Sequence, residues 1–384
     1  MAGRDASGLF DSALDDLRKG YTARAATRMR QAAEMGHAPA RLAYARKLFD
    51  VRAARAQRDA CRWLSLAAED RLPAALYARS AARYAGLCGE PDAAGALADL
   101  NAAATLGHAE AESALALAWL EHGGREARTA ASAWFARSAA HGGLLGRLLL
   151  RGRHLDGHPR GDAGAPPGLR AFAPVTERSR ELLHRQPVVA VSDAGLNTAE
   201  CAWLRLTSRP GLKESRVLDH ATGRPRPHPV RTSTTTYLAP THLQLPALRL
   251  TERLARHAGA PPETAEPLAV LRYRPGQEYR AHRDALGPDA LKGDPLAPAG
   301  DRSATVLCYL NRPARGGETT FPKLDLSVRP EPGRILVFEN LGPEGEPESL
   351  ALHAGLPVTL GTKWLASLWI RQRALPRDAP NASR

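Results

Sequence analysis

Residues 271–284 read LRYRPGQEYRAHRD and end in a histidine-x-aspartate triplet, His282, Arg283 and Asp284. A third histidine, His353, follows downstream, and Lys363 stands ten residues beyond it. Two imidazoles and one carboxylate on one face of a metal form the facial triad that suits non-haem Fe(II) and leaves coordination positions open. The order of these residues therefore predicts a metal site made by His282, Asp284 and His353.

The sequence around the triplet predicts strands. Alternate residues of a strand lie on one face, so His282 and Asp284 are expected to point into the site and Arg283 away from it. A paired strand is expected to bring His353 across from them. From residue 268 onward, short β-rich runs alternate with Gly/Pro turns, which is the pattern of an all-β sandwich.

Four further segments flank these ligands: residues 302–311 (RSATVLCYLN), 316–322 (GGETTFP), 332–338 (PGRILVF) and 352–358 (LHAGLPV). With the triplet, the series resembles the prolyl 4-hydroxylase family of Fe(II)/2-oxoglutarate dioxygenases. The resemblance covers residues 186–374 and implies a double-stranded β-helix, or jelly roll, with flanking helices. It also implies Fe(II), with 2-oxoglutarate and O2 as co-substrates, and it leaves ascorbate open as a further cofactor.

Lys363 is expected to bind 2-oxoglutarate. A charged amine inside a jelly roll is costly unless an anion pairs with it, and the far carboxylate of the co-substrate is such an anion. The resemblance adds Tyr273 as a residue that helps to bind 2-oxoglutarate. Thr305, on the next predicted strand, is expected to contribute a hydroxyl to the same co-substrate. The resemblance also places three residues at the substrate side of the site, although the arginines among them could equally be surface salt-bridge partners: Arg302, Trp369 and Arg371.

The N-terminal part contains a repeat. Alanine pairs followed by a short Gly-rich turn begin at Ala32, Ala67, Ala103 and Ala139, so they are 35, 36 and 36 residues apart. This is the period of a helix-turn-helix solenoid, and the pattern resembles Sel1-type repeats, which are related to tetratricopeptide repeats. The alternative is a generic alanine-rich helical bundle.

The chain is thus expected to be an α+β multidomain protein, a helical solenoid followed by a jelly roll. Within the second domain, Asn197 and Glu200 predict a capped helix, a second helix is expected over residues 245–258, and residues 188–192 are expected to form the first strand. The expected parts are a Sel1-like domain (1–150), a Gly/Pro-rich linker and connecting segment (151–185), the dioxygenase domain (186–374) and a tail (375–384).

The composition limits which partners and which cellular location are expected. The N-terminus has no apolar signal segment, and no apolar run reaches the length of a transmembrane helix. Four scattered cysteines are expected to be reduced, buried thiols in a cytoplasmic protein. The net charge is +13, but the arginines are spread along the chain, so nucleic acid is not the expected partner.

Three functions fit these features. The first is hydroxylation of a protein or peptide side chain, most directly prolyl 4-hydroxylation, with the repeats recruiting the substrate. The second is an oxygenase that acts on a free amino acid or a small metabolite. The third is a repeat-based interaction protein with a vestigial oxygenase domain, and the intact set of His282, Asp284, His353 and Lys363 argues against it.

Overall fold

The computed structural model describes residues 5–51, 53–151, 164–170, 180–193, 195–218, 225–227 and 230–376, with residues 216–218 and 225–227 described by backbone alone. Two compact units make up the chain: Met1–Ala171 with Pro240–Leu248, and Phe172–Ala239 with Arg249–Arg384. The segment Pro240–Leu248, which the sequence places in the dioxygenase domain, therefore groups with the helical unit. Most of the predicted tail, from residue 377 onward, lies outside the described residues.

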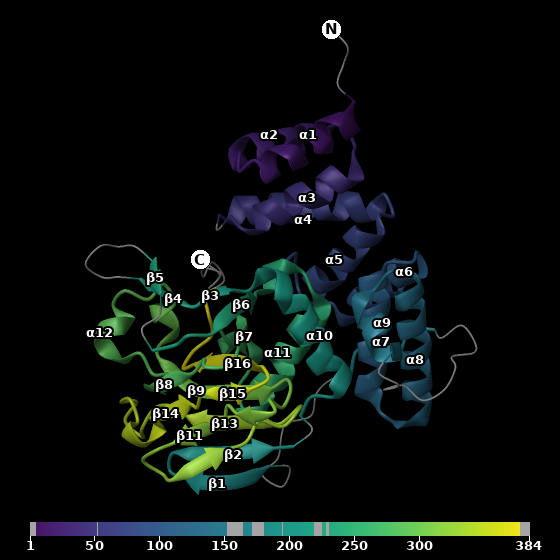
Figure 1. Cartoon of the computed structure of the whole chain (residues 1–384). Helices are drawn as coiled ribbons and strands as arrows, with labels where there is room; N and C mark the ends of the chain where they lie inside the picture. The colour runs from purple at the N-terminus through teal and green to yellow at the C-terminus, as the bar shows by residue number, and fades with distance from the viewer. Residues whose placement is uncertain are drawn as a thin grey trace. The chain divides into compact units, whose positions relative to one another are not determined.

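Helices fill the first unit and pack in successive pairs (Figure 1). α1 packs on α2, α3 on α4, α5 on α6 and α7 on α8, which is the helix-pair arrangement that the repeats predict. In the described part of the chain, no helix combines the length and the apolar character that a membrane span needs. The bounds are α1 Ala6–Arg18, α2 Thr22–Glu34, α3 Ala38–Phe49, α4 Ala54–Glu69, α5 Pro73–Tyr84, α6 Ala93–Thr105, α7 Ala109–His122, α8 Gly124–Ala140 and α9 Leu144–Arg151.

Helix packing explains the alanines of the repeated motif, and backbone conformation explains its glycine. The alanine pairs of the first three copies are buried, so they let the helices approach closely. Directly after the helix end, the glycine of three copies has a left-handed backbone, with φ of 91°, 80° and 93° at Gly36, Gly107 and Gly142. Arg71 replaces glycine in the second copy and still has φ of 57°. The turn therefore keeps its geometry where the sequence is degenerate.

Cys61 and Cys88 form a disulfide in the helical unit, so the prediction of four reduced thiols is wrong for this pair. The bond joins α4 to the loop that follows α5. The two cysteines are 27 residues apart, without a recognisable spacing motif, and the packing of the helices brings them together. Cys201 and Cys308 are free and buried, as the sequence predicts.

Two antiparallel sheets form the jelly roll of the second unit. The larger has the strand order β1-β2-β13-β9-β16-β7-β6-β3, and the smaller has the order β12-β11-β14-β8. Short pairs, β10-β15 and β4-β5, complete it. The bounds are β1 Glu181–Arg185, β2 Val188–Ser192, β3 Lys213–Glu214, β4 Arg216–Leu218, β5 Pro225–Pro227, β6 Thr234–Leu238, β7 Leu268–Tyr273, β8 Tyr279–His282, β9 Arg302–Tyr309, β10 Arg315–Gly316, β11 Thr319–Phe321, β12 Leu326–Val328, β13 Ile335–Glu339, β14 His353–Gly355, β15 Val358–Leu360 and β16 Lys363–Arg371.

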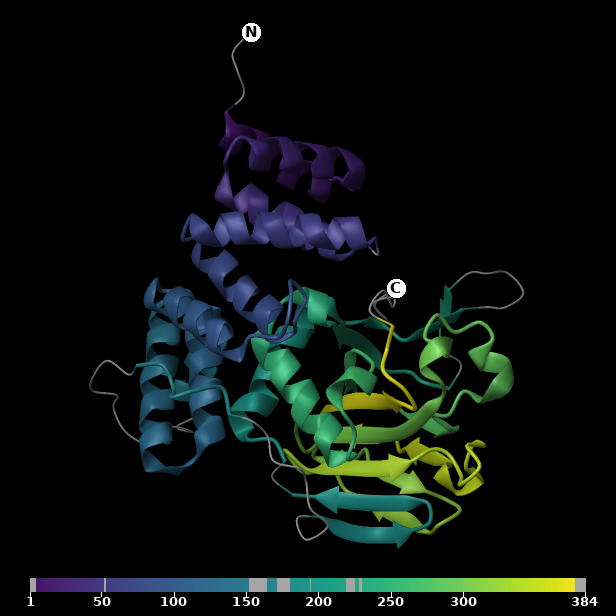
Figure 2. The same ribbon diagram turned by 180° about the vertical axis from the view of Figure 1, so that it is seen from behind.

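The hydrophobic core of this unit lies between the two sheets. It joins Leu307 and Phe338 of the larger sheet to Phe321 and Val328 of the smaller one. Outside, α10 (Thr198–Ser208) contacts β6 and β7 (Figure 2). The core fixes both sheets, and their strand ends can therefore carry a rigid site.

The predicted helices and the strand over residues 188–192 are confirmed, but this strand is the second of the sheet and not the first. α10 begins with the expected capping box of Asn197 and Glu200, and α11 spans Leu245–His257. The sheet begins earlier than the sequence predicts, because β1 precedes and pairs with β2. Its residues, Glu181–Arg185, lie in the segment that was expected to be a connection, so the jelly roll starts before residue 186.

Candidate active site

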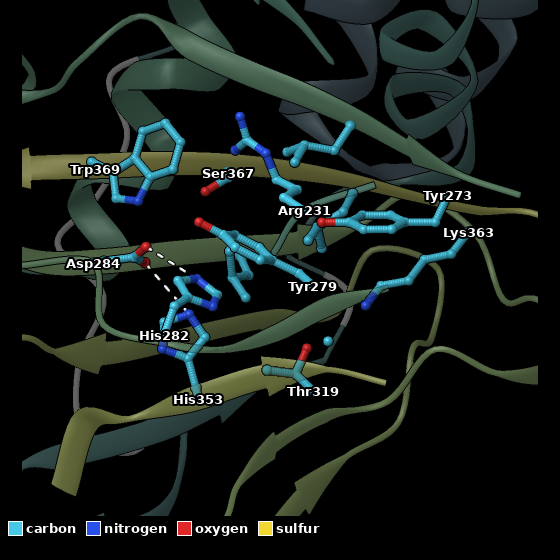
Figure 3. A pocket seen from close by; sticks show the side chains of 14 residues that line it. Arg231, Tyr273, Tyr279, His282, Asp284, Thr319, His353, Lys363, Ser367 and Trp369 are labelled. Atoms are coloured by element: carbon cyan, nitrogen blue, oxygen red, sulfur yellow. Dashed lines mark ion pairs between the residues drawn. The ribbon is translucent and has the colours of Figure 1, made fainter. Parts of the chain in front are cut away.

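Three possible metal ligands converge at the end of β8 (Figure 3). His282 is the last residue of β8, and His353, the first residue of β14, lies opposite it in the antiparallel register. Asp284 lies two residues beyond β8, and its carboxylate oxygens are 3.5 Å from His282 Nε2 and 3.6 Å from His353 Nε2. The ligand atoms all lie within 4.8 Å of one another. The structure thus brings the three residues together, with Asp284 reaching in from the turn after the strand.

The hydrogen bonds and protonation of these residues fit a metal ion. Nδ1 of His282 donates to the Arg280 carbonyl at 2.9 Å, and Nδ1 of His353 donates to the Ala351 carbonyl at 3.0 Å. A neutral ring that donates through Nδ1 leaves the lone pair on Nε2 for a metal. Burial lowers the pKa of His353 to about 4, so its ring is neutral at neutral pH. Burial raises the pKa of Asp284, but the two histidines outweigh it, and the pKa lies well below its usual value.

Thr305 and Asn340 hold the Asp284 carboxylate in place. Thr305 Oγ1 donates to Asp284 Oδ2 at 2.8 Å, and Asn340 Nδ2 donates to Thr305 Oγ1 at 2.8 Å. Thr305 is expected from the sequence to bind 2-oxoglutarate, but it does not line the pocket, and its only hydroxyl proton is used on Asp284. The geometry therefore makes it a residue that positions a candidate metal ligand.

Thr305→Val should weaken Fe(II) binding by about 10- to 100-fold, the usual cost of losing the partner that orients a metal ligand. Valine keeps the shape of threonine but cannot donate to Asp284. A competition titration with a chromophoric chelator measures the affinity. Thr320→Val, on β11 and outside the pocket lining, is the matched control and should bind as the wild type does. Wild-type affinity in the Thr305 variant would contradict this role.

Lys363 shares one pocket with the three ligands (Figure 3). The pocket has a volume of about 410 Å³, including the part that is open to solvent. Lys363 is 2% exposed, and burial lowers the pKa of its ammonium to about 7. Among the described residues, no hydrogen bond or ion pair engages this ammonium, and the rings of Tyr273 and Tyr309 lie 5.5 Å and 5.4 Å from it. A buried ammonium without an anion is costly, so the pocket suits a ligand with a carboxylate.

Tyr273 lies beside Lys363 because the two residues are register partners on β7 and β16. Burial raises the pKa of the Tyr273 hydroxyl, which also forms a hydrogen bond with Ser233. The Tyr273 side chain lines the pocket, as the prediction of a 2-oxoglutarate contact requires.

The pocket also contains residues for which the sequence analysis predicts no role. Tyr279 stacks on His282, with ring centroids 3.4 Å apart, and Arg231 lies over the Tyr279 ring at 5.4 Å. Thr319 accepts a hydrogen bond from Tyr309 at 2.8 Å. Tyr279 lies in the segment that leads into His282, and Arg231 lies within residues 186–374, so the family resemblance was the signal that could have found them.

Arg302 and Arg371, which the sequence places at the substrate side, are both engaged by Glu266. Arg302 binds this carboxylate at 2.8 Å and 2.9 Å, and Arg371 binds it at 2.5 Å. Arg371 also pairs with Asp294 at 2.6 Å, and thereby anchors the segment of residues 285–301 between Asp284 and β9. Neither arginine lines the pocket, so the geometry gives them structural partners and does not support direct substrate contact.

Trp369 is the predicted substrate residue that does line the pocket. Its indole lies under the Arg302 guanidinium, 4.1 Å from the ring centroid. The indole N–H is buried and has no hydrogen-bond partner among the described residues. Trp369 therefore offers the pocket an apolar ring and one unused donor.

Comparisons with known proteins agree with this site. Residues 268–371, which contain the three ligands and Lys363, match the 2OG-Fe(II) oxygenase superfamily. Prolyl 4-hydroxylase 1 of Arabidopsis thaliana is 33% identical over 208 residues, which cover 50% of this chain and 72% of that protein. The chain therefore belongs to the 2OG-Fe(II) oxygenase superfamily and, within it, to the prolyl 4-hydroxylase family. It is a 2-oxoglutarate-dependent dioxygenase that uses Fe(II), 2-oxoglutarate and O2.

Two solved structures are each similar to part of the chain. A viral collagen prolyl hydroxylase from Paramecium Bursaria Chlorella virus-1, solved as a 2OG complex, has 27% sequence identity and a TM-score of 0.38, and the match covers 48% of this chain and 95% of that one. A Sel1 repeat protein from Oxalobacter formigenes has 26% identity and a TM-score of 0.29, covering 34% of this chain and 40% of that one. The Sel1 assignment of the helical repeats stays a prediction.

The affinity for 2-oxoglutarate should fall as the pH rises above about 7. The ammonium form of Lys363 would bind the carboxylate, and its pKa in the free protein is about 7, so binding above this pH must take up a proton. The dissociation constant should rise by up to about tenfold per pH unit there. Calorimetric titration in buffers of different ionisation enthalpy measures both the affinity and the proton uptake. Lys363→Met should remove the dependence, whereas a flat profile in the wild type would contradict it.

Proposed function

We propose that the protein hydroxylates a prolyl side chain in a protein or peptide, with Fe(II), 2-oxoglutarate and O2. The observation that carries the proposal is that one pocket contains the three candidate ligands, a buried lysine without an ion pair to any described residue and the indole of Trp369. An apolar indole suits the uncharged ring of proline. Relatives that match this chain over most of their own length are named as prolyl 4-hydroxylases. Their names support a prolyl substrate for this protein.

Each residue then has a definite part. His282, Asp284 and His353 would hold Fe(II), and Lys363 with Tyr273 would bind the far carboxylate of 2-oxoglutarate. Bound iron supplies dioxygen activation coupled to the decarboxylation of 2-oxoglutarate. The substrate C–H bond becomes C–OH, and 2-oxoglutarate and O2 yield succinate and CO2. The protein itself contributes ligand geometry, an anchored co-substrate and a pocket that partly excludes water.

We further propose that the helical repeats recruit the substrate, since stacked helix pairs present an extended binding surface. Ascorbate stays a prediction as a further cofactor. The cytoplasmic location also stays a prediction, and the disulfide between Cys61 and Cys88 weighs against it because disulfides are rare where thiols are kept reduced.

The test is a screen of substrates by mass spectrometry. The iron-loaded protein is incubated with 2-oxoglutarate, air and a peptide library from a proteome digest, next to a mixture of free amino acids and small metabolites. The expected product is a peptide with one added oxygen atom on proline, formed only when 2-oxoglutarate is present. An added oxygen on a free amino acid or metabolite alone would refute the peptide substrate and favour the small-molecule oxygenase.

A further inference from the structure

The segment Gly164–Arg170, with the sequence GAPPGLR, lies against the helical unit through a set of convergent hydrogen bonds. Trp119 on α7 and Trp134 on α8 both donate their indole N–H to the Gly164 carbonyl, at 2.9 Å and 3.0 Å. His122 bonds the Gly168 carbonyl at 2.9 Å. All of these residues belong to the same compact unit. Two indoles directed at one carbonyl indicate a built recognition site.

The segment is bound mainly through its backbone carbonyls and one proline. Pro166 is buried, while Gly164 and Pro167 are exposed. The segment has no regular secondary structure, and proline provides no N–H of its own. A surface of indole and imidazole groups that binds backbone carbonyls suits an extended chain, and proline favours that conformation.

The helical side of this site is held rigid. Trp134 is 2% exposed, and the guanidinium of Arg137 lies 4.7 Å from its ring centroid. Arg137 in turn donates to Glu112 at 3.3 Å, and this fully buried carboxylate also binds His141 at 2.9 Å. The position of the indole is therefore fixed by the repeats and not by the segment. A buried indole N–H needs an acceptor, so an equivalent carbonyl from another chain could take the place of Gly164.

We propose that Trp119, His122 and Trp134 form a binding groove for an extended, proline-containing peptide, and that residues 164–170 occupy this groove as an intramolecular competitor. The inference rests on the proposed function in one respect: the partner would be the prolyl substrate itself. The groove is the place where the repeats would bind this substrate, through hydrogen bonds to its backbone carbonyls. A tethered segment competes at a high effective concentration, so the substrate would have to displace it.

The test is a binding titration that needs no turnover. A fluorescently labelled synthetic peptide with the sequence of residues 164–170 is titrated with the full-length protein without Fe(II) or 2-oxoglutarate, and anisotropy is measured. A released variant, with residues 164–170 replaced by glycine and serine, should bind the peptide about threefold more tightly or better, because the tethered competitor is gone. Equal binding by the wild type and the released variant would overturn the proposal.

The role of the indoles must be tested in the released variant. In the wild type, a lost indole donor would weaken the binding of the added peptide and of the tethered segment alike, so the two effects would cancel. In the released variant, Trp119→Phe should weaken peptide binding about fivefold, as expected for one lost hydrogen bond. Trp63→Phe, the same change in another repeat, is the matched control. A peptide with alanine in place of the proline equivalent to Pro166 should also bind more weakly, and this requires no protein variant.

The possible outcomes distinguish a failure of the proposed groove from a failure of the proposed reaction. Unchanged binding after Trp119→Phe and after the proline replacement would refute the groove, even if a prolyl peptide is hydroxylated. The expected losses in binding, without hydroxylation of any prolyl peptide by the iron-loaded protein, would keep the groove and refute the proposed reaction.

Discussion

His353→Ala is expected to abolish the conversion of 2-oxoglutarate to succinate that depends on Fe(II), and His282→Ala to do the same. Each change removes one of three ligands that lie within 4.8 Å of one another, and a two-ligand site cannot retain the metal at catalytic strength. Succinate release, with and without added Fe(II), measures the loss. Bound metal after dialysis, determined by elemental analysis, should fall in parallel.

The control for this prediction is His184→Ala. His184 lies on β1, where it bonds the Pro187 carbonyl at 2.8 Å, and it is outside the pocket lining. This variant should keep wild-type turnover and wild-type metal content. Full activity in either ligand variant, with a folded protein by circular dichroism, would show that the triad is not the metal site.

Lys363→Ala should raise the KM for 2-oxoglutarate by about tenfold or more, because a charge-assisted contact is worth roughly 1.5–3 kcal/mol. The effect on kcat should be smaller, since Lys363 would hold the far end of the co-substrate and no reacting atom. Lys363→Met tests the same contact without leaving a cavity. It should show a similar KM and, without 2-oxoglutarate, a Tm at or above that of the wild type, because the wild type buries an ammonium that no ion pair engages in the described part of the chain.

Lys323→Ala is the matched control, since Lys323 is exposed and outside the pocket lining. Its titration with 2-oxoglutarate should match that of the wild type. A wild-type curve in both Lys363 variants would mean that another residue binds the far carboxylate, and Arg231 in the same pocket would be the next candidate.

The local sequence pattern was sufficient to predict much of the candidate site. The His-x-Asp spacing, the position of His353 and the lysine ten residues later follow from the chain order and from the pairing of β8 with β14. The helical repeat was visible because the first three copies bury the same alanine pair and three copies have a left-handed glycine.

Roles that depend on distant partners could not be read from the sequence. The partner of Arg371 is Glu266, which is 105 positions away, and Asn340 reaches Thr305 across 35 positions. Both arrangements result from the order of strands in the large sheet. The Cys61–Cys88 pair was also missed, because the packing of the helices, and not the spacing of the cysteines, determines which thiols meet.

The most direct test of the central claim follows the oxygen atoms. The full-length, iron-loaded protein is supplied with 2-oxoglutarate, heavy-isotope O2 and the proline peptide that the screen identifies, and both products are analysed by mass spectrometry. We expect one heavy oxygen in hydroxyproline and one in succinate, in equal molar amounts. Hydroxyproline that carries oxygen from water, or peptide oxidation without matching succinate, would contradict a 2-oxoglutarate-dependent prolyl hydroxylase.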